Sequence, residues 1–158
     1  MNSSVSRVRR APAALLLLAL ASFAAPAFAR LGGDFASINE DSARVRGQLV
    51  STDLLNYQRH DITTSAGTVI HEYLSRSGKV FAVTWQGPLP PDLRQLFGDY
   101  FESFRSAAAA QSHPGGHRQF SIQQSDFVMQ ASGHLRAFQG RAFVPSLVPS
   151  GVTISELP

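Results

Sequence analysis

Two similar turn sequences, eleven residues apart, constrain the fold more than any other feature of the chain. Residues 64–68 (TSAGT) and 75–79 (SRSGK) each fit a type I turn that ends with glycine in the left-handed conformation. Such turns join neighbouring antiparallel strands. The chain should therefore form a three-stranded meander over residues 57–64, 68–74 and 79–86.

The register of this meander follows if each turn closes at the residues that flank it. In the first hairpin, Asp61 should face His71, and His60 should face Glu72. The pairs expected in the second hairpin are Tyr73 with Phe81, His71 with Val83, and Val69 with Trp85. This register places Asp61 and His71 on one face of the sheet and His60 and Glu72 on the other. A slip of one residue would exchange the two faces of a strand.

An amphipathic helix follows the proline-rich corner at residues 87–91. Asp92 is a good N-cap, because its side chain can accept hydrogen bonds from the first turn. Apolar residues then recur at helical spacing, at Leu93, Leu96, Phe97, Tyr100, Phe101 and Phe104. We therefore expect a helix near residues 92–106 that lies on the sheet. A glycine within a helix costs about 1 kcal/mol relative to alanine. Close packing of a neighbouring element against the helix would explain why Gly98 occurs there.

The rest of the chain has weaker signals. Ser37 could cap a short helix that runs to about Arg46, and residues 51–56 resemble a connector. The remaining expected elements are a short strand at 120–122, a hairpin of 126–132 with 135–143 across Gly133-His134, and a surface tail at 145–158. In that hairpin Met129 should face Phe138, and Asp126 should face Arg141. The prediction is an α+β fold, with an antiparallel sheet of five or six strands packed on one main helix.

The N-terminus has the three parts of a secretory signal peptide. Basic residues precede an apolar run at 11–25, and the small-x-small sequence at 27–29 (AFA) resembles a signal peptidase site. We expect a signal peptide over 1–29 and a single globular domain over 30–158, located in the periplasm or secreted. An uncleaved N-terminal anchor is the alternative.

The composition excludes several classes of protein. Three of the 14 basic residues lie in the leader, so the remaining 11 balance the 11 acidic residues and give no reason to expect nucleic acid as a partner. No later segment could span a membrane. The absence of cysteine excludes disulfides, thiolate metal sites and a cysteine nucleophile.

Six sequence motifs resemble a family of small secreted bacterial proteins, which is catalogued as the domain of unknown function number twenty-eight forty-four. They are residues 31–34 (LGGD), 67–73 (GTVIHEY), 78–88 (GKVFAVTWQGP), 91–100 (PDLRQLFGDY), 132–138 (SGHLRAF) and 140–145 (GRAFVP). The resemblance covers nearly the whole mature chain. It implies export and a single domain, but it brings no activity, cofactor or catalytic residue.

The meander offers weak candidates for catalysis. The pairs Asp61–His71 and His60–Glu72 each join a carboxylate to an imidazole, as in part of a catalytic triad or beside a metal-bound histidine. No nucleophile is marked by its surroundings, and there is no G-x-S-x-G elbow. Simple cross-strand pairing is the alternative interpretation.

Two further groups are candidates for binding. Arg59, Tyr73 and Trp85 could form an aromatic surface for a sugar, a peptide or a cation, but the Phe-rich helix needs cover, and core packing of the aromatic residues is the ordinary interpretation. A loop site for a metal could use His113, His117 and His134, but no established metal-binding motif supports it, and a mobile loop is the alternative.

The sequence favours an exported, non-catalytic module that binds an envelope protein, a glycan or a small apolar ligand. No cofactor is expected. A partner, a ligand or the N-terminal segment should cover the second, semi-apolar face of the meander. The alternative is a small periplasmic hydrolase or metal-binding protein that uses the His, Asp and Glu pairs of the meander.

Overall fold

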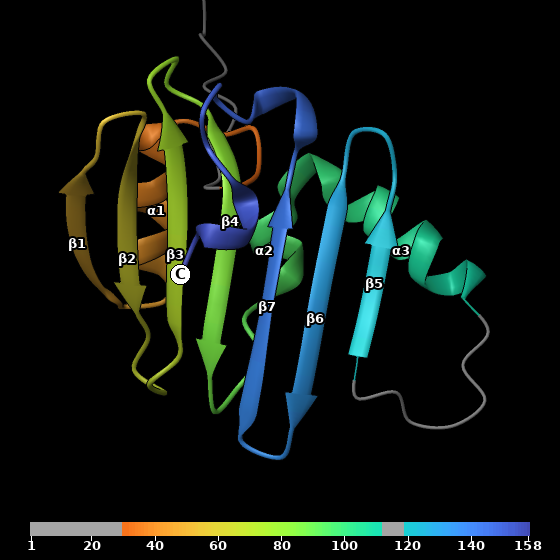
Figure 1. Ribbon diagram of the computed structural model, residues 1–158. Coiled ribbons are helices and arrows are strands. Elements are labelled where there is room, and N and C mark those ends of the chain that lie inside the picture. Colours follow the sequence, from red (N-terminus) through yellow and green to blue (C-terminus); the bar gives the residue numbers. More distant parts are fainter. Residues whose placement is uncertain (1–29, 112–118) are drawn as a thin grey trace, which may run out of the picture.

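The computed structural model describes residues 30–111 and 119–158, which form a seven-stranded antiparallel sheet with helices on one face (Figure 1). The strand order is β1-β2-β3-β4-β7-β6-β5. The strands are β1 (Gln48–Asp53), β2 (Tyr57–Thr63), β3 (Val69–Ser75), β4 (Val80–Gly87), β5 (Gln119–Gln123), β6 (Val128–His134) and β7 (Ala137–Phe143). The helices are α1 (Phe35–Arg44), α2 (Leu93–Phe97) and α3 (Phe101–Ala110), with single 3₁₀ turns at η1 (Gly98–Tyr100), η2 (Pro145–Leu147) and η3 (Ile154–Glu156).

The α+β class is confirmed, but the expected number of strands was too low. The additional strand is β1, part of which was predicted as a connector. It is an edge strand, and its Val50 side chain is exposed, so the apolar alternation that marks a strand is weak. The first helix also begins earlier than predicted, because Asp34 and not Ser37 is its N-cap. The Asp34 carboxylate accepts a hydrogen bond from the Ser37 amide at 3.1 Å.

Both glycine turns of the meander are confirmed, with Gly67 and Gly78 at φ +85° and +79°. The first hairpin has the predicted register, with Asp61 opposite His71 and His60 opposite Glu72. The second hairpin does not. Its pairs are Val69 with Gln86, Ile70 with Trp85, His71 with Thr84, Glu72 with Val83 and Tyr73 with Ala82.

A β-bulge explains this error. The register shifts between Tyr73 and Leu74, so that Phe81 is an extra residue on β4. A bulge of this kind brings two successive side chains toward the same face, and Phe81 and Ala82 both pack against Tyr73. From Ala82 to Gln86, each β4 side chain therefore points to the opposite face of the sheet from the one predicted. Trp85 and Val83 therefore join the helix face.

The predicted amphipathic helix is broken at Gly98. Asp92 caps α2 as expected, and its carboxylate accepts hydrogen bonds from the amides of Arg94 and Gln95. Gly98 then adopts φ +51°, and the Arg30 side chain lies against the position that a Cβ would occupy. Close packing therefore accounts for the glycine, but the chain bends there. The apolar stripe still packs into the core on both sides of the bend.

The C-terminal hairpin has a different turn from the predicted one. β6 and β7 pair as Met129 with Ala142 and Gln130 with Arg141, and the two-residue loop is Leu135-Arg136. Arg136 takes the left-handed conformation at φ +64°, although it is not a glycine. Gly133 serves another purpose, because a Cβ there would lie 2.6 Å from the Phe138 ring.

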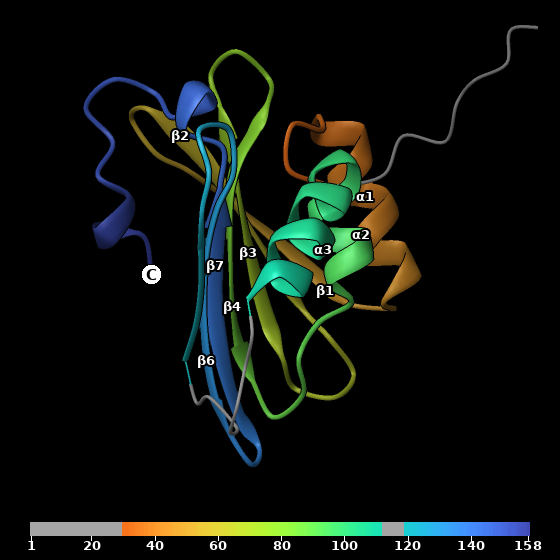
Figure 2. The same ribbon diagram turned by 90° about the vertical axis from the view of Figure 1, so that its right-hand side faces the viewer.

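The core has two parts, one on each face of the sheet. On the helix face, α1, α2 and α3 cover a large cluster of apolar residues, to which every strand of the sheet contributes (Figure 2). On the opposite face, which we call the tail face, residues 145–158 cover Tyr73, Phe81 and Ala82. Leu157 of this C-terminal segment completes the smaller cluster. The apolar part of the second face is therefore covered by the chain's own C-terminal segment, which the expectation of a partner, a ligand or the N-terminal segment did not include.

Among the residues that the structure describes, no helix has both the length and the apolar character needed to cross a bilayer.

Candidate functional site

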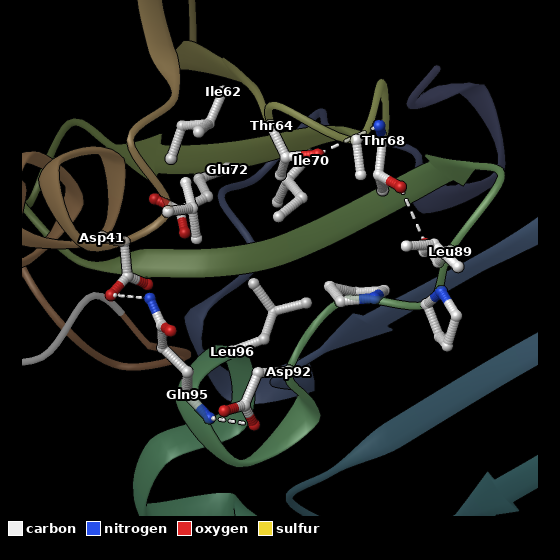
Figure 3. A pocket seen from close by; sticks show the side chains of 14 residues that line it. Asp41, Ile62, Thr64, Thr68, Ile70, Glu72, Leu89, Asp92, Gln95 and Leu96 are labelled. Carbon is white, nitrogen blue, oxygen red and sulfur yellow. Dashed lines mark hydrogen bonds between the residues drawn. The ribbon is translucent and has the colours of Figure 1, made fainter.

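A pocket of about 220 Å³ lies on the helix face, between β2–β3 and the segment that leads into α2 (Figure 3). We call it the carboxyl pocket. Its lining residues are Asp41, Val45, Ile62, Thr64, Ala66, Thr68, Ile70, Glu72, Leu89, Pro90, Pro91, Asp92, Gln95 and Leu96. Most of this lining is apolar, and three of its polar residues carry carboxyl groups.

The first glycine turn and the proline corner form the entrance of the carboxyl pocket. The Thr68 hydroxyl donates a hydrogen bond to the Leu89 carbonyl at 2.7 Å, which ties the turn to the corner. Gly87 permits this approach, because a Cβ there would lie 2.5 Å from the Thr68 backbone. Ala66 is exposed at the rim, whereas Ile70 is buried inside. This hydrogen bond and the close contact at Gly87 therefore hold the two sides of the entrance together.

Glu72 is the most unusual residue of the carboxyl pocket. It lies on β3 between His60 of β2 and Val83 of β4, and its alternation along the strand turns it toward the helices. The residue has 0% exposure, and neither carboxyl oxygen has a hydrogen-bond partner among the residues that the structure describes. Burial, and to a smaller extent the charge of Asp41, raises the pKa of Glu72 well above its ordinary value. Burial therefore favours the protonated, uncharged form of Glu72, and both of its oxygens are available to a ligand.

Asp41 of α1 supplies a second carboxyl at the same end of the pocket (Figure 3). It is 3% exposed, and it accepts a 2.6 Å hydrogen bond from the side-chain amide of Gln95 on α2. Burial raises the pKa of Asp41 to about 7, even though the Gln95 hydrogen bond and the Arg44 charge act in the opposite direction. Asp41 therefore gains or loses its proton near neutral pH.

His60 borders the same buried region under α1. It is 1% exposed, its ring lies 5.3 Å from the Phe35 ring, and its Nδ1 is 2.8 Å from the Ser51 hydroxyl. Its Nε2 is buried without a partner. Burial lowers the pKa of His60, with the Asp61 charge opposing the shift, so the ring is neutral around neutral pH.

The second carboxylate–imidazole pair lies on the tail face. Asp61 Oδ1 is 2.6 Å from His71 Nδ1 and 2.9 Å from Arg59 Nε. The structure therefore confirms both predicted pairs as neighbours but separates them onto opposite faces of the sheet. The four residues do not converge in one pocket, and His60 and Glu72 share no hydrogen bond in the part of the chain that is described.

The other sequence candidates are not brought together either. Tyr73 is buried under the C-terminal segment, where its hydroxyl donates to the Pro158 carbonyl at 2.7 Å, and Trp85 is buried on the helix face. With Arg59, they do not form one exposed aromatic surface. His134 is exposed at the end of β6, and His113 and His117 lie outside the described residues. Within the described ranges, no three His, Cys, Asp or Glu side chains are placed to hold a metal.

Sequence reasoning missed Asp41 and Gln95. Gln95 lies outside the predicted apolar stripe of its helix, and Asp41 was one polar residue in a weakly predicted helix. The two residues are 54 positions apart, so only the packing of α1 beside α2 joins them. One available signal was the position of Asp41 one turn after the buried Ile38, because residues three or four apart share a helix face.

Comparison with known proteins identifies the family of the chain. The family model described as "Protein of unknown function (DUF2844)" matches residues 27–157. The chain belongs to this family. The match confirms the resemblance seen in the sequence motifs, and it includes every residue of the carboxyl pocket. No curated protein matches the chain, and no solved structure does.

Proposed function

We propose that this member of the family is an exported, non-catalytic binding module, and that its carboxyl pocket holds a small ligand with an apolar body and a hydrogen-bonding head. One observation carries the proposal: Glu72 is fully buried at the end of an apolar pocket, and both of its carboxyl oxygens lack a hydrogen-bond partner within residues 30–111 and 119–158.

The energetics of Glu72 support a ligand. A buried polar group without a hydrogen bond costs about 1–3 kcal/mol, so the empty pocket carries a penalty that a bound donor would remove. An apolar side chain of similar size would avoid that penalty altogether. The position therefore suits a residue kept for binding better than one kept for stability.

The size of the pocket indicates the size of the ligand. An engineered protein cavity of about 150 Å³ binds benzene. The carboxyl pocket, at about 220 Å³, has room for a ring of that size with a short polar head. Ile62, Ile70 and Leu96 would contact the body of the ligand, and Glu72 would face its head.

The proposal predicts a saturable site for benzyl alcohol, measured by chemical-shift changes in ¹H–¹⁵N spectra of residues 30–158. Amide signals of Ile70, Glu72 and Leu96 should shift with a single dissociation constant. Ala66→Trp at the rim should weaken binding at least about tenfold by obstructing the entrance, because a bulky ring would occupy the path of the ligand.

A matched control is available in the same turn. Ser65 is exposed but does not line the carboxyl pocket, so Ser65→Trp should leave the dissociation constant unchanged. If both tryptophan variants bind benzyl alcohol as the parent does, or if the shifts map to another surface, the ligand does not enter the carboxyl pocket and the proposal fails.

One observation favours a hydrolase as the second candidate. Ser51, His60 and Glu72 lie opposite one another on three adjacent strands, and the Ser51 hydroxyl is 2.8 Å from His60 Nδ1. These three residues follow the order of a Ser-His-Glu catalytic triad. However, Glu72 makes no hydrogen bond to the His60 ring in the described part of the chain, so it is not placed to orient the imidazole or stabilise an imidazolium. This argument favours binding over catalysis.

A fluorophosphonate probe separates the two candidates, because it labels serine hydroxyls that a neighbouring base activates. We expect no labelling of residues 30–158, with Ser51→Ala as the reference for background. Covalent labelling of Ser51 that depends on His60, lost in His60→Gln, would support the hydrolase and contradict the non-catalytic module.

A further inference from the structure

We propose that the head of the ligand is a primary ammonium group, and that its binding releases a proton from the carboxyl pocket to solvent. This inference rests on the proposed function, because it names the chemistry of the ligand that the same pocket would hold. The volume of the cavity limits the size of the ligand, whereas the acidic residues of its lining determine the charge of the head that it can bind.

The charge of the lining supports a cation. The residues of the carboxyl pocket include three carboxyl groups, from Asp41, Glu72 and Asp92, and none of its 14 lining residues is Lys, Arg or His. A bound carboxylate or phosphate would face these acids without any basic partner. A cationic head meets groups that can each become its counter-ion.

The geometry of the acids fits an ammonium group. An alkylammonium has three N–H donors, which can satisfy several oxygens at once. Glu72 offers two unpartnered oxygens, and Asp41, whose Oδ1 already accepts from Gln95, lies at the same end of the pocket (Figure 3). An inorganic cation such as Ca²⁺ would need six to eight oxygen ligands, which this mostly apolar lining does not provide.

The environment of Glu72 determines the proton balance. His60 faces it from β2 and Asp41 from α1, Val83 is its neutral neighbour on β4, and Asp92 and Gln95 reach the pocket from α2. Arg44 and Glu40 of α1 act on Asp41 through their charges. Burial favours the protonated form of Glu72 in the empty pocket, because neither carboxyl oxygen has a hydrogen-bond partner among the described residues to compensate an ionised carboxylate.

Ammonium binding reverses this preference. The ligand arrives with its three N–H bonds intact, the O–H bond of the Glu72 carboxyl breaks, and the proton passes to the buffer. The products are an ammonium–carboxylate pair inside the pocket and one proton in solution. A neutral head of the same shape would accept or donate a hydrogen bond without releasing this proton.

Isothermal titration calorimetry at pH 6 tests the inference with benzylammonium and the isosteric benzyl alcohol. Each titration is repeated in phosphate and in Bis-Tris, whose ionisation enthalpies differ, so the difference in measured heat counts the protons released. We expect benzylammonium to bind at least about tenfold more tightly than benzyl alcohol, since hydrogen bonds between charged groups are the stronger kind. It should release between about half a proton and one proton, whereas benzyl alcohol should release none.

Two variants locate the effect. Glu72→Gln should reduce both the preference for benzylammonium and the proton release, with Asp41, whose pKa is about 7, supplying what remains of each, while benzyl alcohol still binds. Asp61→Asn removes a carboxylate from the tail face and should change neither quantity. If Glu72→Gln does not fold, as judged by circular dichroism, Asp41→Asn provides the second test and should reduce the preference for benzylammonium.

The outcomes separate the two proposals. Equal affinity for both probes, or benzylammonium binding without proton release, would overturn the ammonium assignment and leave the proposed binding function intact. Failure of both probes to bind the parent protein would overturn the proposed function and this inference together.

Discussion

Phe97→Ala should lower the free energy of unfolding by about 3–5 kcal/mol, the range for removing a fully buried phenylalanine. Phe97 has no exposed surface, and its ring lies 5.2 Å from Phe127, 5.3 Å from Phe104 and 6.1 Å from Trp85. These contacts join α2 to α3, to β4 and to the residue that precedes β6. The substitution would therefore leave a cavity where the helices meet the sheet.

Urea denaturation measures this effect directly. Trp85 is the only tryptophan of the chain, and it contacts Phe97, so its fluorescence reports on the affected region. Leu135→Ala is the control, because Leu135 is 93% exposed in the β6–β7 turn and its loss should change stability by less than about 0.5 kcal/mol. A loss below about 1 kcal/mol for Phe97→Ala would mean that the helices do not depend on this aromatic cluster.

The features that sequence reasoning predicted correctly are those with local causes. Gly67 and Gly78 encode their turns within five residues each, and Asp92 caps its helix through its own side chain. The register of the first hairpin followed from its turn alone. In each case the responsible atoms are neighbours along the chain, so one sequence contains the information that is needed.

The errors have causes that are distant in the sequence. Gly98 bends the helix where Arg30 packs against it, 68 positions away. The bulge at Phe81 allows that ring to join Tyr73 under the C-terminal segment, which a turn motif cannot reveal. Gly133 resembled a turn glycine, but it accommodates the Phe138 ring across the hairpin. Long-range packing overrides the local preference at all three positions.

The same distinction applies to the candidate site. The sequence placed His60 beside Glu72 and on the face opposite Asp61, because hairpin register and strand alternation determine both facts. It could not place Asp41 or Gln95 in the carboxyl pocket, because their positions depend on how α1 and α2 pack against the sheet. Glu72, an acid within a strand of mostly apolar residues, and Asp41, one turn after Ile38, were the local signs of the candidate site.

The second large effect expected is a loss of stability as the pH rises from about 4 to 7. Burial raises the pKa of Asp41 to about 7 and that of Glu72 well above its ordinary value, whereas both ionise near pH 4 in the unfolded chain. The folded state therefore binds more protons in this range, and its free energy of unfolding falls as the pH rises. Asp41 alone should contribute a fall of about 2–4 kcal/mol, since each pKa unit corresponds to about 1.4 kcal/mol.

His60 acts in the opposite direction and over a lower range. Its pKa is lowered in the folded state, so below about pH 6.5 the unfolded chain takes up a proton that the folded protein does not. Stability gained from His60 therefore increases with pH until about 6.5 and is constant above it. The two acids lower stability over the same range and beyond it, so the single imidazole of His60 makes the fall shallower below about pH 6.5 without reversing it.

Asp41→Asn distinguishes these contributions, because asparagine retains an oxygen for the Gln95 amide but cannot ionise. Urea denaturation between pH 4 and 8 should show a shallower fall in this variant, with most of the gain in stability at pH 7–8 and little at pH 4. Glu72→Gln should act in the same direction. A parent protein whose stability rises between pH 6.5 and 8, or an Asp41→Asn profile parallel to that of the parent, would show that the acids are hydrated in the folded state. The carboxyl pocket would then lack the dry environment on which both ligand binding and proton release depend.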